Sequence, residues 1–183
     1  FSAGGGNHGY ITFNNSSTFT VNTGSNTGSV SNDDSELWWC NASSTNYIAY
    51  CFTSIPGFSA FSSYVGDGNV SGPVIICGFK PAWVMIKSAT GTTNSSYYSW
   101  CIWDNVRSPH NPTDDPLFAN SSVTEGYRGN TTTTDGGDYL KIDFLSNGFK
   151  VRNDSGTPEI NISGNDYIYA AFAEMPKKYA NAR

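Results

Sequence analysis

The chain has 183 residues, of which 38% are hydrophobic, 15% aromatic and only 14% charged, and its formal net charge is −5. This length suits one domain with a sizeable core, and the aromatic content argues against a disordered chain. The acidic balance, with no basic cluster larger than Lys177-Lys178, excludes the basic footprint of a nucleic-acid binder. No apolar run approaches the length of a membrane helix. Glutamine is absent and leucine is rare, so the composition lacks helix formers and predicts an all-β protein.

The chain begins with a glycine-rich segment, residues 1–9, which is expected to form a flexible arm before a single domain over residues 10–183. Short runs of β-branched and aromatic residues, separated by Gly, Asn, Ser and Pro, fill the domain. They predict about eleven strands: Tyr10–Phe13, Thr18–Asn22, Glu36–Cys40, Tyr47–Thr53, Phe58–Tyr64, Pro73–Phe79, Trp83–Lys87, Tyr97–Trp103, Tyr139–Leu145, Phe149–Arg152 and Tyr167–Ala173. Many short strands with turns between them indicate an antiparallel β-sandwich.

The clearest local pattern is a hairpin near residue 147. Leu140, Ile142 and Phe144 alternate with polar residues, which predicts a strand with one solvated face. The segment 146–148 (Ser-Asn-Gly) predicts a tight turn, because Asn and Gly both tolerate positive φ. A returning strand with the same alternation is expected from Phe149.

Two other strands are apolar throughout. Residues 74–77 (Val-Ile-Ile-Cys) and 83–86 (Trp-Val-Met-Ile) show no alternation. Both faces of these strands are therefore expected to be covered by protein. Pro81 cannot donate to a ladder and marks the corner between them.

Four cysteines stand at positions 40, 51, 77 and 101, each within an apolar strand-like run. Such cysteines behave as small buried hydrophobic residues, so reduced core thiols are expected. Disulfide pairing remains the alternative. The chain has no C-x-x-C pair, so no zinc site is predicted.

No catalytic motif is recognisable. His8 lies in the glycine arm and His110 in a Pro-flanked turn, and there is no G-x-S-x-G nucleophile elbow. The acidic residues show no pattern of two carboxylates across a cleft. Acidic turns could bind calcium, but Asp favours turns for conformational reasons alone. We therefore predict no catalytic residue, no metal site and no cofactor.

Residues 104–137 form the longest segment without a strand pattern, and such loops are often either functional or disordered. Tyr97 and Tyr98 before it and Tyr127 within it are the candidate ligand-binding residues, because tyrosine rings offer sugars an apolar face with a polar tip. The alternative is that Tyr98, Trp100 and Ile102 pack into the core. Nine N-x-S/T sequons occur, but they follow from the composition and do not predict glycosylation.

A family resemblance covers about residues 36–183. Its motifs are Tyr47–Phe52, Gly57–Ser59, Tyr64–Gly68, Gly72-Pro73, Gly78–Lys87, Trp103–Arg107, Asn111-Pro112, Leu117–Asn120, Asp143–Lys150, Tyr167–Glu174 and Lys178–Arg183. In these motifs the chain resembles a module of tailed-bacteriophage virion proteins, found in tail-fibre and other appendage proteins beside concanavalin-like lectin modules. The resemblance implies a jelly-roll or concanavalin-like sandwich and carries no catalytic residues. Within it, Asp104 and Arg107 are expected to form a structural ion pair across a turn.

The sequence and the resemblance together predict a non-enzymatic virion structural protein, displayed as a fibre, decoration or receptor-facing domain. Its expected partners are other virion proteins, further copies of itself (a trimer by analogy) and a host-surface glycan, with no nucleic acid and no membrane insertion. Its expected location is the virion. The alternatives are a purely architectural tail or capsid component without a ligand and, least favoured, a glycan depolymerase.

Overall fold

The computed structural model describes residues 8–10, 20–22, 52–90, 99–122, 124–126, 140–153 and 160–174. The chain divides into two compact units, one made of residues 1–11 and 19–52 and the other of residues 12–18 and 53–183. In the first unit, β1 (His8–Tyr10) pairs antiparallel with β2 (Thr20–Asn22). Strand β1 begins inside the expected 1–9 arm and shares only Tyr10 with the strand expected at Tyr10–Phe13.

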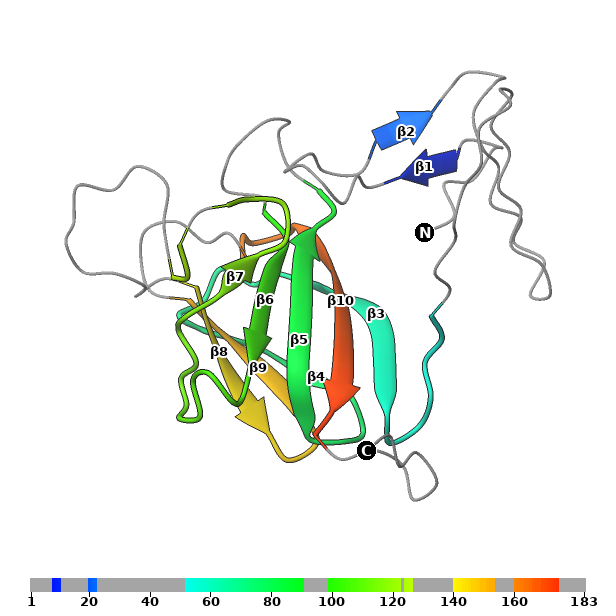
Figure 1. Ribbon diagram of the computed structural model, residues 1–183. Coiled ribbons are helices and arrows are strands. Elements are labelled where there is room, and N and C mark those ends of the chain that lie inside the picture. Colours follow the sequence, from blue (N-terminus) through cyan, green and yellow to red (C-terminus); the bar gives the residue numbers. More distant parts are fainter. Residues whose placement is uncertain are drawn as a thin grey trace. The chain divides into compact units, whose positions relative to one another are not determined.

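The second unit contains two antiparallel sheets (Figure 1). The five-stranded sheet has the order β3 (Ser59–Val65), β10 (Asp166–Ala173), β5 (Pro81–Ser88), β6 (Cys101–Asp104) and β7 (Leu117–Phe118). The three-stranded sheet has the order β4 (Ser71–Ile76), β9 (Gly148–Asn153) and β8 (Leu140–Leu145). The described residues contain no helix. The prediction of an all-β, antiparallel protein is confirmed.

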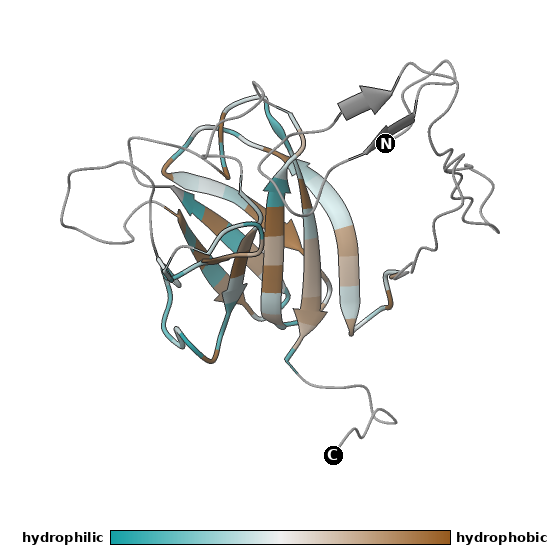
Figure 2. Ribbon diagram, turned by 45° about the horizontal axis from the view of Figure 1, so that its top comes forward, coloured by the Kyte–Doolittle hydropathy of each residue, from teal (hydrophilic) through white to brown (hydrophobic). Residues whose placement is uncertain are grey.

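The hydrophobic core lies between the two sheets and draws side chains from both. Figure 2 shows hydrophobic residues, coloured brown, along the strands of both sheets. The core cluster consists of Ile75, Phe79, Val84, Ile86, Cys101, Trp103, Leu140, Ile142, Phe144, Phe149, Val151, Ile160, Tyr167, Tyr169 and Ala171. One face of β8 packs on this core, as the alternation predicts. The other face is not fully solvated as expected, because Asp143 on it is buried and pairs with Arg152 of β9.

The strand predictions agree with the structure in most of the described segments. Eight expected strands correspond to β2, β3, β4, β5, β6, β8, β9 and β10, with ends displaced by up to four residues. Strand β7 was not expected, and the segment Glu36–Cys40 lies outside the described residues. Of Tyr47–Thr53, only Phe52 and Thr53 are described, and they are not in a strand. The described part of the chain thus holds ten strands, eight of them in the larger unit.

The hairpin at residues 140–153 is confirmed, but the reason given for its glycine is wrong. Leu145 pairs with Gly148, which leaves Ser146 and Asn147 as the turn. Gly148 is not among the glycines with positive φ. A Cβ atom at this position would lie 2.0 Å from the Ile75 carbonyl oxygen. Gly148 is therefore required by the close approach of strand β4.

The expectation that residues 74–77 are covered on both faces is wrong. Val74 is 50% exposed and Ile76 61% exposed, whereas Ile75 between them is buried. Strand β4 is an edge strand with its outer face in solvent, and an apolar run cannot distinguish this from full burial. In β5 the outer residues Trp83 and Met85 are half-buried, so the expectation holds better there.

A fully buried asparagine joins the loop after β3 to the turn before β10. The Asn161 amide donates to Asp67 Oδ1 (2.8 Å) and to the Asn69 carbonyl (2.9 Å), and its oxygen accepts from the Asp67 N–H (2.9 Å). Two glycines pack tightly here. A Cβ atom at Gly66 would lie 2.3 Å from the Ile162 carbonyl oxygen, and one at Gly72 would lie 2.6 Å from Asn161 Nδ2. Because this amide nitrogen is buried and bonded, the sequon at Asn161 is unsuited to glycosylation.

Two tyrosines secure the same end of the larger unit. Tyr64 and Tyr167 stack with ring centroids 5.0 Å apart. The Tyr64 hydroxyl donates to the Ile160 carbonyl (2.7 Å), and the Tyr167 hydroxyl accepts from the Ile162 N–H (2.9 Å). Burial raises the pKa of Tyr64 well above its ordinary value, so its hydroxyl remains a donor at neutral pH.

Two of the four cysteines lie in described segments, and both carry reduced thiols. Cys101 is buried in the core. Cys77 is half-buried and packs against the core cluster. Burial raises the pKa of Cys77 to about 11, although a hydrogen bond with Tyr169 opposes the shift. The prediction of core thiols is confirmed for these two residues. Cys40 and Cys51 lie outside the described residues.

Candidate functional site

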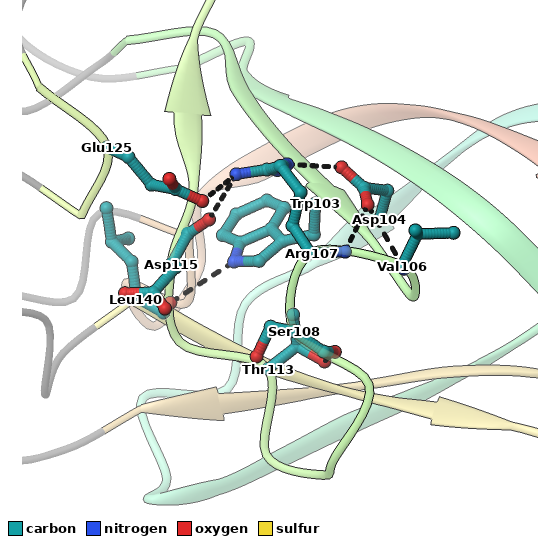
Figure 3. Close-up of polar contacts among 9 residues, drawn as sticks. All are labelled: Trp103, Asp104, Val106, Arg107, Ser108, Thr113, Asp115, Glu125 and Leu140. Carbon is teal, nitrogen blue, oxygen red and sulfur yellow. Dashed lines mark hydrogen bonds and ion pairs between the residues drawn. The ribbon is translucent and has the colours of Figure 1, made fainter.

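The loop that follows β6 is held by Arg107 (Figure 3). The guanidinium pairs with Asp104 and Glu125, and its Nη1 donates to the Asp115 carbonyl (3.1 Å). One side chain thus fastens the beginning, the middle and the end of the segment 104–125. The predicted ion pair between Asp104 and Arg107 is confirmed.

Asp104 also shapes the turn at the start of this loop. Its Oδ1 accepts from the backbone N–H of Val106 (3.1 Å) and of Arg107 (2.9 Å). Burial alone would raise the pKa of Asp104, but hydrogen bonds from the Arg107 backbone and side chain hold it below its usual value. Asp104 therefore stays ionised at neutral pH and keeps its charge opposite Arg107.

A second set of contacts fastens the loop to strand β8. The Asn111 side chain donates to the Phe144 carbonyl and accepts from the Phe144 N–H, both at 2.9 Å. Thr113 exchanges backbone hydrogen bonds with Ile142 at 2.8 and 3.1 Å. The peptide bond between Asn111 and Pro112 is cis. His110, in the bend beside it, is exposed and lies in a turn as expected.

A third contact is the unexpected strand β7, which extends the five-stranded sheet. Leu117 pairs with Ile102 and Phe118 with Cys101. The Gly126 N–H donates to the Pro116 carbonyl (3.0 Å) and so brings the end of the loop back to the start of β7. Beneath the loop, the fully buried Trp103 donates its indole N–H to the Leu140 carbonyl (3.3 Å).

These contacts make the described part of the loop a fixed surface. Residues 104–122 and 124–126, called here the clasped loop, are attached to β6 and β8 and to themselves. Val106 projects at its first turn with 82% of its surface exposed. A loop held on a rigid scaffold suits recognition, because little ordering entropy remains to be lost on binding.

The candidate ligand-binding residues Tyr97, Tyr98 and Tyr127 lie outside the described residues, but their described chain neighbours are well placed. Ser99 follows the tyrosine pair, and its hydroxyl lies 3.5 Å from the Asn120 amide nitrogen, just beyond β7. Gly126 precedes Tyr127 and is bonded to Pro116, at the start of β7. The attachment points of both tyrosine segments therefore flank the two ends of one short strand.

The alternative assignment, in which Trp100 and Ile102 share a core face with Tyr98, is corrected in part. Cys101 and Trp103 point into the core, and Ile102 is half-buried on the other side of β6. Trp100 is buried, as expected, but it precedes the strand.

The acidic groups of the clasped loop lie near Arg107, and Asp104 and Glu125 both pair with it. Burial raises the pKa of Asp115, and the charges of Asp114 and Glu125 add to the shift. Within the described ranges, no three His, Cys, Asp or Glu side chains gather as metal ligands. The acidic turn at Asp67 bonds to Asn69 and Asn161. The same ranges contain no helix with the length and hydropathy of a membrane span.

The larger unit is thus an all-β fold of two antiparallel sheets that carries an ordered loop after β6. The chain belongs to the family described as a domain of unknown function (DUF7483), whose model matches residues 5–176. No curated protein matches the chain significantly, and no solved structure does so either.

Sequence reasoning found the Asp104–Arg107 pair but missed the other contacts of the clasped loop. Asn111, Thr113 and Glu125 are far apart in sequence, and their partners are backbone groups or a distant arginine. The sequence signals were the length of the segment and its turns. Two of its three X-Pro sequences, Asn111-Pro112 and Asp115-Pro116, indicated turns but not what the turns contact.

Proposed function

We propose that this chain is a non-enzymatic structural module of a bacteriophage virion that works by contact, displayed as a fibre, decoration or receptor-facing domain. The single observation that supports a contact role best is the clasped loop, where Arg107 ties Asp104, Asp115 and Glu125 together. The motif resemblance supports the assignment to a virion. The complete fold under this proposal is a jelly-roll or concanavalin-like sandwich of about eleven strands.

The proposed ligand is a host-surface glycan bound beside β7. The attachment points of the tyrosine segments, Ser99 and Gly126, flank that strand. Under the proposal, the rings of Tyr97, Tyr98 and Tyr127 stack on sugars, while the amide and carbonyl groups of the loop supply hydrogen bonds. Display in many copies on the particle, as a homo-oligomer among other virion proteins, compensates for weak single contacts.

The test uses the full chain on an array of bacterial surface polysaccharides. We expect binding that is lost in a triple variant, Tyr97→Ala/Tyr98→Ala/Tyr127→Ala. The matched Tyr→Phe triple variant should retain most of the binding, because it keeps the rings and removes only the hydroxyls. Binding unaffected by the alanine variant, or binding to no polysaccharide, contradicts the glycan role and leaves the architectural one.

A second measurement addresses catalysis. The bound polysaccharide is incubated with the protein, and new reducing ends are counted. The proposal expects none above a protein-free control. Reducing ends released in proportion to protein would instead identify a depolymerase.

A further inference from the structure

Strand β4 presents an exposed apolar edge that does not belong to the clasped loop. It is the last strand of the order β4-β9-β8, and within the described residues only β9 pairs with it. The stretch from Val70 to Phe79 contains no charged side chain. Natural edge strands are usually protected by charge, by proline or by cover. Among the residues that the structure describes, Pro73 is the one such protection, and it lies where the β4–β9 ladder is irregular, between Ser71 and Val74.

The ladder geometry shows which backbone groups face outward. In an antiparallel pair, the N–H and C=O groups of successive residues point alternately toward and away from the partner strand. The Cys77 N–H donates to the Asn147 carbonyl on the β9 side (2.9 Å). Ile75, two residues earlier in the regular part of the ladder, therefore also faces β9. The backbone groups of Val74 and Ile76 face the open edge.

The side chains at the same two positions are exposed on the outer face of the sheet. Val74 is 50% and Ile76 61% exposed, while Ile75 points into the core. The open backbone groups and the exposed aliphatic groups thus belong to the same residues. On an acidic chain, this is an uncharged strip suited to another β-strand.

We propose that β4 pairs antiparallel with β4 of a second copy of this chain, about a two-fold axis at Ile75. In this register, Val74 lies opposite Ile76 of the second copy, and Ile76 lies opposite its Val74. Both positions have outward-facing backbone groups, so each opposed pair exchanges two hydrogen bonds and the contact gains four. The four exposed aliphatic side chains then cover one another, and the three-stranded sheet becomes a continuous six-stranded sheet.

The strand is self-complementary, which is why a second copy is the occupant we infer. An isologous contact requires a patch that matches itself under a two-fold rotation, and Val74-Ile75-Ile76 does so without opposing like charges. The nearest cation on the neighbouring strand is Lys150, which pairs with Val74 but lies on β9 and not on the edge strand itself. The contact is two-fold, so it does not by itself build the trimer implied by the resemblance; threefold association would require another surface. The inference is independent of glycan binding.

The test is sedimentation equilibrium of the full chain over a wide concentration range. We expect a reversible monomer–dimer equilibrium. The variant Val74→Lys/Ile76→Lys places the introduced lysines opposite one another and should weaken the dimer roughly a hundredfold or more. The variant Val74→Lys/Ile76→Glu places opposite charges together in the same register and should restore a dimer that weakens with salt. The control Val65→Lys, on an exposed position of β3, should leave the equilibrium unchanged.

Amide exchange followed by NMR tests the register independently. In the dimer, the N–H groups of Val74 and Ile76 should become protected as concentration rises, whereas that of Cys77 is protected at every concentration. A monomer at all concentrations would overturn the proposal. So would a dimer that survives the double-lysine variant, or amides of Val74 and Ile76 that exchange equally fast in monomer and dimer.

Discussion

Replacing Asn161 by alanine tests whether one buried amide holds an end of the larger unit together. The substitution removes three hydrogen bonds: two donated by Nδ2, to Asp67 Oδ1 and the Asn69 carbonyl, and one accepted from the Asp67 N–H. At about 1 kcal/mol net for each bond, the loss of unfolding free energy is about 3 kcal/mol. For a domain of this size, this lowers Tm by roughly 6–12 °C.

The assay is thermal and urea unfolding of the full chain, with Asn165→Ala as the matched control. The Asn165 amide makes only a long contact, 3.5 Å, with the Thr90 carbonyl, so this variant should lose less than about 1 kcal/mol. Asn161→Asp keeps the shape but turns a carboxylate toward Asp67, so it should be least stable at neutral pH and recover partly in acid. If Asn161→Ala and Asn165→Ala unfold at the same temperature and the same urea concentration, the proposed role of the buried amide is wrong.

Three further predictions concern other parts of the larger unit. Gly148→Ala should lower the free energy of unfolding by more than about 3 kcal/mol, because its Cβ atom would lie 2.0 Å from the Ile75 carbonyl oxygen. Gly57→Ala, with open space and φ of +74°, should lower it by only about 1 kcal/mol. Equal losses of unfolding free energy in urea would contradict this. Burial lowers the pKa of Lys87 from 10.5 to about 8. Between pH 8 and pH 10.5 the unfolded chain therefore binds more protons than the folded one, so the unfolding free energy of the wild type should rise with pH relative to that of Lys87→Met. Parallel stability curves for the two proteins would exclude that shift. Arg107→Ala should lower the free energy of unfolding by about 1–2 kcal/mol, since the ion pairs of Arg107 are partly exposed. It should also speed amide exchange in the clasped loop. Unchanged exchange rates would show that Arg107 does not hold this loop.

The sequence predicts the elements of this fold better than their environment. Alternation in β8 and the turn before Gly148 identified a hairpin correctly, because both signals are local. The burial of β4 was predicted wrongly, because an apolar run looks the same in a covered strand and in an edge strand with one exposed face. Strand β7 was missed because two residues, Leu117 and Phe118, form no pattern and are held only by pairing with β6.

The candidate site was predicted only where its contacts are close in sequence. Asp104 and Arg107 stand three residues apart, so a turn brings them together. Glu125 and Asn111 reach their partners across 18 and 33 residues, and composition gives no sign of such pairings. The long segment was therefore expected to be functional or disordered, whereas its described part is ordered by Arg107 and by attachment to β8.

We propose that the domain works by contact through the clasped loop. The most direct measurement is an NMR titration of the isotope-labelled full chain with a saccharide fragment of the polysaccharide selected on the array. The account predicts saturable shifts in the amides of residues 99–126 and no change in the saccharide itself. Shifts confined to other strands, or a saccharide shortened during the titration, would contradict it.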